Sequence, residues 1–237
     1  MPFAVFSDIH SNWEALQEAL DYLSKEKIDG YQTLGDSVGY GASPNECFGW
    51  VVENAIALMG NHEQAVIDTD LLKWFSPEAK TAAEWTTDVL KPVLRDKISN
   101  LQYLHLSSNA TLAHGSPDKP EKYRYLFSFN DARSSFGAFK TPLCFVGHTH
   151  VPSLFTESNR TAKYLLPGIY PLRREEHCIL NPGSVGQPRD RDPRLSLGIF
   201  DDETWTFQLV RLKYDNKKAA DKIRAAGLPA YLADRLL

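Results

Sequence analysis

Cysteine is scarce in this chain, and the few cysteines show no pattern. Cys47, Cys144 and Cys178 are odd in number, lie far apart and form no Cys-x-x-Cys pair. Disulfide-stabilised and cysteine-based zinc domains need paired or clustered cysteines. The sequence therefore predicts reduced thiols and favours a cytoplasmic location.

Long hydrophobic runs and a strong net charge are also absent. No uninterrupted apolar stretch reaches the ~18 residues that a membrane span needs. The amino terminus has no basic segment and reaches Asp8 at once, which is unlike a signal peptide. With 26 basic and 30 acidic residues the formal charge is −4. So mild a charge predicts neither a membrane nor a stable nucleic-acid partner.

The chain does contain enough hydrophobic residues for a sizeable core, 43% of 237 residues. Its first part alternates short apolar segments, polar turns and amphipathic stretches, which predicts a parallel sheet with helices. Asn12 or Ser11 can cap the first helix, and Ser43 to Glu46 is typical of a capping box with proline at the first helical position. We expect strands at residues 3–7, 31–34 and 55–59, and helices at 12–25, from 44 onward and across 76–100.

The second part of the chain is richer in short strands. We expect them at residues 110–113, 143–146, 153–156, 178–180, 195–200 and 205–212. A helical tail follows at 215–237, broken near Gly227 and Pro229, and the best candidate for a long irregular loop is 117–130. No linker separates two halves, so we expect one α/β domain over residues 1–237 with two sheets.

Five short polar segments stand at the ends of predicted strands. They are Asp8-Ile9-His10, Gly35-Asp36, Gly60-Asn61-His62-Glu63, His114-Gly115 and Gly147-His148-Thr149-His150. Ligands of open α/β sheets collect outside the carboxyl ends of strands, so these segments can converge on one site. Imidazole, carboxylate and amide groups together suit divalent transition metals, and this mixture suits two ions about 3.5–4 Å apart with one bridging carboxylate.

Each segment alone is weak, because such short patterns occur by chance and an isolated histidine is usually structural. The combination is specific, since five of the seven histidines fall in these segments. The other two, His105 and His177, are expected to be structural.

In this order the segments resemble the calcineurin-like metallophosphoesterases, whose pattern is DxH, GD, GNH(D/E), H and GHxH. The match extends from Asp8 to His150. The stretches 35–47 and 181–189 are further similar to a branch of small prokaryotic phosphodiesterase-like members. The resemblance implies two packed mixed β-sheets flanked by helices, a four-layer α-β-β-α sandwich.

The same resemblance implies roles for individual residues. One divalent ion would be held by Asp8, His10 and His150, a second by Asn61, His114 and His148, and Asp36 would bridge them; the ions are Mn, Fe, Zn, Ni or Co. A metal-bound hydroxide would attack phosphorus in line. His62 would stabilise the transition state or protonate the leaving oxygen, and Glu63 would orient its imidazole.

One departure bears on the substrate. Protein phosphatases of this superfamily carry an Asp-Arg pair after the GD motif, whereas this chain continues Ser37-Val38-Gly39. Without that arginine, phosphate recognition would fall to the metals, backbone amides, Asn12, Arg189 or the basic loop, where Arg124 is the best candidate. Because an arginine clamp matters most for a dianionic monoester, a small phosphodiester or nucleotide-like substrate is favoured.

Several alternatives remain open at this point. A phosphomonoesterase, a protein phosphatase or a diadenosine-polyphosphate hydrolase would use the same ligands, and a non-catalytic scaffold can share the fold. Tyr123 and Tyr125 are candidates to touch a base or leaving group. Four of the five tryptophans, by contrast, are expected to be core residues on helices, and these are Trp13, Trp50, Trp74 and Trp85. The oligomeric state is not predicted.

Overall fold

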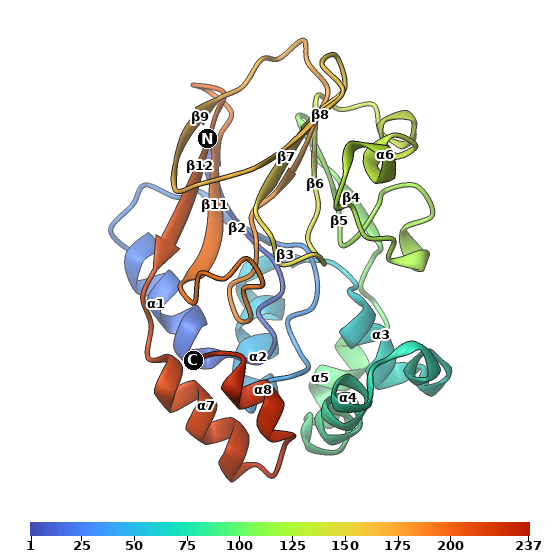
Figure 1. Ribbon diagram of the computed structural model, residues 1–237, viewed down its shortest axis with the longest axis vertical. Coiled ribbons are helices and arrows are strands. Elements are labelled where there is room, and N and C mark those ends of the chain that lie inside the picture. Colours follow the sequence, from blue (N-terminus) through green and yellow to red (C-terminus); the bar gives the residue numbers. More distant parts are fainter.

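The computed structural model describes residues 1–237 and contains two mixed six-stranded sheets (Figure 1). The first sheet has the order β3 (Ala55–Ala57), β2 (Gly30–Thr33), β1 (Pro2–Phe6), β11 (Leu195–Asp201), β12 (Thr206–Leu212) and β9 (Gly168–Pro171). The second has the order β4 (Leu104–Leu106), β5 (Ala110–Ala113), β6 (Leu143–Phe145), β10 (Cys178–Asn181), β7 (Ser153–Thr156) and β8 (Thr161–Tyr164). The expected pair of mixed sheets is confirmed.

The first sheet is parallel on the side of β3, β2 and β1 and antiparallel on the other, whereas the second sheet has a parallel centre and antiparallel flanks. β1, β2 and β3 are parallel, as are β5, β6 and β10, while β11 runs antiparallel to β1. The sequence missed β4, β8 and β9, which are short strands at sheet edges. None of their residues is fully buried, so the alternation of buried and exposed positions that marks a strand is missing there.

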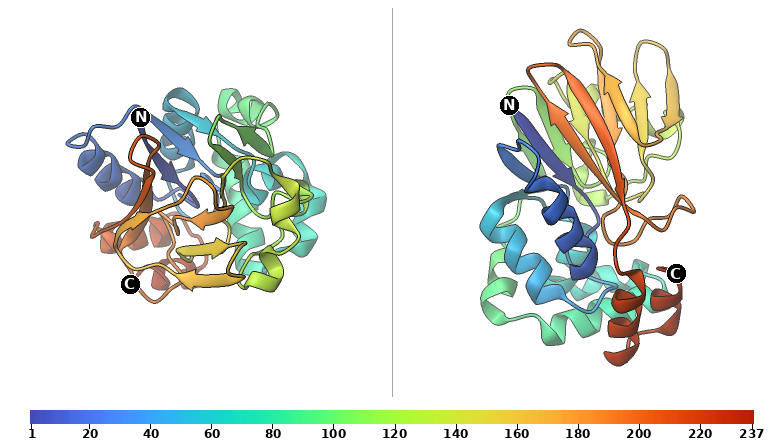
Figure 2. Two further views of the ribbon diagram at one scale, coloured as in Figure 1. Left: turned by 90° about the horizontal axis from the view of Figure 1, so that it is seen from above. Right: turned by 90° about the vertical axis from the view of Figure 1, so that its left-hand side faces the viewer.

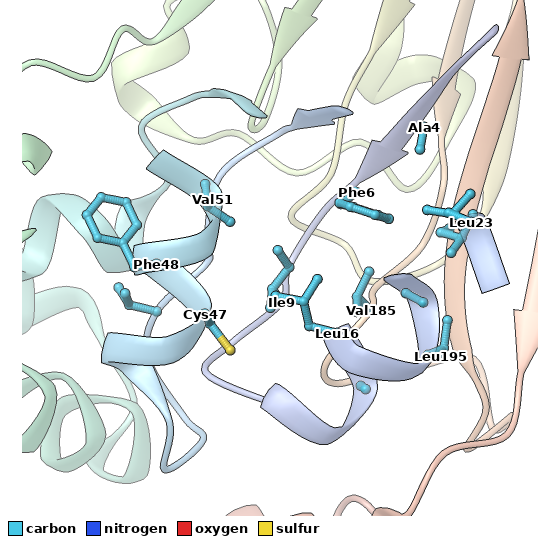
Figure 3. Packing of buried hydrophobic residues seen from close by; sticks show 14 of the residues in the cluster. Ala4, Phe6, Ile9, Leu16, Leu23, Cys47, Phe48, Val51, Val185 and Leu195 are labelled. Carbon is cyan, nitrogen blue, oxygen red and sulfur yellow. The ribbon is translucent and has the colours of Figure 1, made fainter. Parts of the chain in front are cut away.

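Three apolar interfaces make the four expected layers. On β1, Ala4 and Phe6 face the helices α1 (Trp13–Leu23) and α2 (Pro44–Asn54), as Figure 3 shows for part of this cluster. Val5, with the opposite orientation, packs between the two sheets. A third cluster lies between the second sheet and the short helices α6 (Phe129–Ala132) and η3 (Ser135–Ala138).

The helix boundaries follow capping chemistry with two differences from expectation. Asn12 caps α1 by accepting a hydrogen bond from the Ala15 N–H at 3.1 Å. α2 begins at Pro44 as predicted, but the Ser43 side chain makes no capping hydrogen bond. The expected helix over 76–100 is two helices, α4 (Pro77–Val89) and α5 (Pro92–Ile98), because a proline inside a helix removes a hydrogen bond and clashes with the preceding turn.

A group of helices closes one end of the sheets, the lower end in Figure 1 (see also Figure 2). It contains α3 (Asn61–Ile67), η1 (Thr69–Trp74), α4, α5, α7 (Asn216–Ala225) and α8 (Ala230–Asp234). Ala82 of α4 packs in one apolar cluster with Ala220 of α7 and Leu232 of α8. The segment 117–130 contains the short η2 (Pro120–Lys122) and the start of α6. None of the helices is long and apolar enough to cross a bilayer.

Candidate metal centre and substrate cleft

The predicted polar segments meet at the carboxyl ends of five strands, β1, β2, β3, β5 and β6. Six of the seven predicted ligands are buried and Asn61 is half-buried. Five of them have left-handed backbone conformations, namely Asp8, His10, Asp36, His148 and His150. Such conformations cost free energy in non-glycine residues and cluster at functional sites. Hydrogen bonds between loops hold them, among them the Asp8 N–H to the Gly35 carbonyl at 3.1 Å.

The first cluster is formed by Asp8, His10 and His150. His150 Nε2 lies 3.3 Å from Asp8 Oδ1 and 3.2 Å from His10 Nε2. Asp8 Oδ2 accepts hydrogen bonds from the Ser7 hydroxyl and the His148 N–H, whereas the buried Oδ1 has no donor. A buried carboxylate oxygen without a donor is costly unless a cation binds it.

The second cluster contains Asp36, His114 and His148, with Asn61 beside them. His114 Nε2 lies 3.2 Å from Asp36 Oδ2, 3.2 Å from Asn61 Oδ1 and 3.0 Å from His148 Nδ1. The same Asp36 Oδ2 is 3.8 Å from His10 Nε2 of the first cluster. Asp36 therefore stands between the two clusters, as a bridging carboxylate must.

Backbone carbonyls set the protonation of three of these histidines. The Nδ1 atoms of His10, His114 and His150 lie 3.0, 2.9 and 2.6 Å from the carbonyls of Val38, Leu34 and Gln187. A carbonyl can only accept, so Nδ1 carries the proton and Nε2 turns its lone pair toward the cluster. This outer hydrogen bond is the arrangement that orients metal-binding histidines.

The titration behaviour of the clusters fits a cation site. Burial moves the pKa of His10 and of His148 well below the usual value. Burial also opposes protonation of His114, but the neighbouring Asp36 carboxylate raises its pKa to about 9. Without a cation the carboxylates thus draw a proton into the site, and metal binding would displace it. The unpaired Asp8 Oδ1 of the first cluster and the facing imidazole nitrogens of both clusters therefore match divalent ions.

His62 lies directly beside the clusters and lines the adjoining cleft. Its backbone N–H donates to Asp36 Oδ1 at 2.9 Å, and its buried Nδ1 has no hydrogen-bond partner. Burial lowers the pKa of His62 to about 4, so the imidazole is neutral at pH 7. A ring nitrogen of His62 also lies close enough to His10 and Asp36 to share an ion with them.

Glu63 does not make the contact that the family resemblance implied. Its carboxylate accepts hydrogen bonds from four backbone N–H groups, those of Asp36, Ser37, Val38 and Gly60, at 2.5–3.3 Å. No hydrogen bond joins it to His62, so the expectation that Glu63 orients that imidazole is wrong. Burial raises the pKa of the Glu63 carboxyl to about 7, and the hydrogen bonds from the backbone N–H groups partly offset this rise. Glu63 instead fixes the loop that carries Asp36.

The three predicted substrate residues are placed very differently. Asn12 caps α1 with its side-chain oxygen, and its amide donates to the Gly186 carbonyl and the Tyr214 hydroxyl. Arg124 is exposed, pairs with Asp118 and is not among the residues that line the cleft. Arg189 does line the cleft, half-buried, with a guanidinium that contacts Gln187 and Tyr40 but no carboxylate.

A cleft of about 610 Å³ opens beside the clusters. Its lining includes Lys122 from the basic loop, and ring and cationic side chains that were not predicted as site residues, namely Tyr40, Trp74, Phe75 and Arg235. The core prediction was wrong for Trp74, which is 79% exposed, while Trp13, Trp50 and Trp85 are half-buried against hydrophobic clusters. Tyr123 and Tyr125 line the cleft, and Tyr125 stacks on His148 with ring centroids 3.8 Å apart.

Two neighbouring buried clusters of histidine and aspartate at the strand ends of two packed sheets are typical of a metal-dependent hydrolase. Comparison with protein families makes the assignment specific. The chain belongs to the calcineurin-like phosphoesterase superfamily, whose domain model matches residues 1–204. Members of this family bind divalent metals, and both clusters fit such ions.

Individual relatives are similar to this chain over nearly its whole length. An uncharacterised protein of Methanocaldococcus jannaschii is 37% identical over 98% of this chain and 96% of its own. The crystal structure of a metallophosphoesterase from Sphaerobacter thermophilus is 36% identical, with a TM-score of 0.89 over 100% of this chain and 98% of its own. A hypothetical protein of Pyrococcus horikoshii, 19% identical with a TM-score of 0.79 over 99% and 97%, shares the fold.

Proposed function

We propose that this protein is a dinuclear-metal phosphoesterase whose substrate is a small phosphodiester or a nucleotide-like phosphate ester. The observation that supports it most is the position of Asp36 Oδ2, which faces both histidine clusters. Asp8, His10 and His150 would hold one ion, Asn61, His114 and His148 the other, and Asp36 both. The ions would be Mn, Fe, Zn, Ni or Co, which imidazole and carboxylate ligands suit.

Bound divalent ions would supply a hydroxide nucleophile near neutral pH and would polarise the phosphoryl oxygen. The protein's own residues then bind and orient the ester. His62, neutral and with an unpartnered ring nitrogen, would donate a hydrogen bond toward the leaving or phosphoryl oxygen. Glu63, through its four backbone N–H partners, would keep the Asp36 loop in position.

Of the cations that the sequence offered for phosphate binding, Arg189 lines the cleft and Arg124 does not. Lys122, Arg189 and Arg235 line the cleft and none of them forms an ion pair with a carboxylate. Other arginines, such as Arg124 and Arg194, are paired with aspartates. Unpaired cations in a cleft beside a metal centre favour an anionic ligand, and we propose that Arg189 binds the phosphoryl group.

The size of the cleft favours a diester, which has two substituents on phosphorus, over a small monoester, which has one. At about 610 Å³ it has room for a substituent on each side of the phosphorus. A diadenosine-polyphosphate hydrolase would fit the same cleft and remains the nearest alternative. A non-catalytic scaffold is disfavoured, because every ligand and His62 are present and face one another.

The test compares a bis-aryl phosphate with the matching mono-aryl phosphate after the protein is stripped of metal and reloaded with each of Mn, Fe, Co, Ni, Zn and Mg. We expect turnover only in metal-loaded protein, with kcat/KM higher for the diester. No turnover with any metal would refute the enzymatic proposal, and a clear monoester preference would refute the substrate class. Nucleotide esters and diadenosine polyphosphates complete the panel and separate the nearest alternative.

A further inference from the structure

Trp74 is the most exposed large hydrophobic side chain of the molecule, at 79%. It belongs to no hydrophobic cluster and stacks on no other ring of the protein. The other rings of the cleft are already engaged: Tyr40 and Phe75 pack on His62, and Tyr125 on His148. An indole left uncovered in a cleft is surface that a ligand can bury.

The position of Trp74 is fixed by the residues around it. It ends η1, where Leu72 is buried in a small cluster with Ala65 of α3 and Ala83 of α4. Asp68 caps η1 by accepting from the Asp70 N–H at 3.1 Å. The next residue, Phe75, packs against the same cluster and against the His62 ring, 4.9 Å between centroids. Trp74 is therefore presented on an anchored turn, one residue from a contact with His62.

The electrostatics of the cleft identify what would cover this indole. Lys122, Arg189 and Arg235 bring three positive charges, and Glu121 brings one negative charge, in a chain whose overall formal charge is −4. A neutral apolar ligand or a hydrophobic peptide would leave these cations unmatched. A ligand with both an aromatic plane and phosphate charge matches all of them, and a nucleotide has this chemistry.

We propose that Trp74 is the stacking platform for the base of a nucleotide ester whose phosphorus lies at the metal clusters, an inference that rests on the proposed phosphoesterase function. The non-reacting nucleoside occupies the part of the cleft that Trp74 lines. Arg235, the residue that follows α8, adds a cation from a part of the chain outside the matched family domain. Specificity for nucleotidic over simple alkyl esters therefore resides in η1 and the carboxyl-terminal helices.

Two diesters with the same leaving group test this assignment. Thymidine 5′-(p-nitrophenyl phosphate) and methyl p-nitrophenyl phosphate differ only in the group that the Trp74 subsite would bind. We expect wild type to prefer the nucleoside ester. Trp74→Ala should lower kcat/KM for that ester by about 5- to 150-fold, the equivalent of one base–aromatic stack, through a higher KM. The methyl ester should be unaffected, and Trp74→Phe should keep most of the preference.

The matched control is Tyr164→Ala, which removes an aromatic side chain of similar exposure, 73%, from the edge strand β8 outside the cleft. Tyr164→Ala should leave kcat/KM unchanged for both esters. A second readout needs no turnover: adenosine 5′-monophosphate should quench tryptophan fluorescence in wild type and in Tyr164→Ala, and the quenching should be lost in Trp74→Phe.

The outcomes separate the two proposals. Equal kcat/KM for both esters in wild type, or a preference that Trp74→Ala leaves intact, would overturn the stacking assignment while the phosphoesterase function stands. Failure to hydrolyse either ester with any metal would overturn the phosphoesterase function. The quenching experiment would then test separately whether a nucleotide binds at Trp74. Quenching that persists in Trp74→Phe would also overturn the assignment.

Discussion

Replacing Arg189 by alanine is the most direct test of how this cleft holds a phosphate. The half-buried guanidinium lies 3.1 Å from Gln187 Oε1 and 3.4 Å from the Tyr40 hydroxyl, and its Nε has no acceptor. Its donors are therefore weakly used in the free protein and available to an anion. A charge-assisted hydrogen bond is worth about 1.5–3 kcal/mol, so Arg189→Ala should lower kcat/KM by about 10- to 150-fold.

The loss should be larger for a monoester dianion than for a diester monoanion, because the dianion carries more charge to neutralise. Arg189→Lys should recover part of the activity, since it restores the charge but not the planar pair of donors. Steady-state kinetics on mono- and bis-aryl phosphates would measure both effects. Metal content and Tm must stay near wild type, so that the loss can be assigned to substrate binding.

Two further arginines serve as comparisons. Arg194 lies on the same loop but is paired with Asp192 at 2.7 Å, so Arg194→Ala should leave kcat/KM within about twofold. Arg124 was another of the sequence-based candidates, and its pairing with Asp118 outside the cleft predicts a similarly small effect. If Arg189→Ala were as active as wild type, or if Arg124→Ala lost as much activity, the assignment of the phosphate cation would be refuted.

Three other predictions concern the metal centre and its support. Asp36→Ala should lose most of both metal ions, because one carboxylate faces both clusters, and elemental analysis beside wild type would check it. His62→Ala should lower kcat by roughly 10²–10⁴ while the metal content stays near that of wild type. The loss should be smaller for nitrophenolate leaving groups, which need little hydrogen-bond assistance to depart. Loss of metal in this variant would instead make His62 a ligand. Glu63→Gln should lower the free energy of unfolding by about 2–4 kcal/mol, because the amide NH₂ would face backbone N–H donors. Chemical denaturation would measure the loss, with Glu84→Gln at an exposed position as the control.

The residues of the candidate metal centre could be picked out from the sequence because their signals are local. Each ligand follows an apolar segment that forms a strand, and parallel strands carry their carboxyl ends to one edge. The cap at Asn12 and the start of α2 at Pro44 depend on neighbouring residues alone. The ligand types themselves select divalent metals, whatever the distances between them.

Contacts between distant segments could not be predicted in the same way. Nothing near Glu63 in the sequence shows that its carboxylate meets the N–H groups of residues 36–38, because loop packing brings them together. The sequence does not show which of Arg189 and Arg124 is free to bind a phosphate. Only the fold pairs Arg124 with an aspartate and places Arg189 in the cleft.

Trp74 shows most clearly what the sequence alone could not predict. Aromatic residues are usually buried, and the sequence around Trp74 contains no sign to the contrary. Its exposure depends on Leu72 occupying the cluster beneath η1, which leaves the indole on the open side. Local sequence thus determined most of the buried strands, the cap at Asn12 and the residue types of the candidate ligands. Tertiary packing alone decided which polar and aromatic side chains remain free to meet a substrate, since burial is a property of the whole assembled chain.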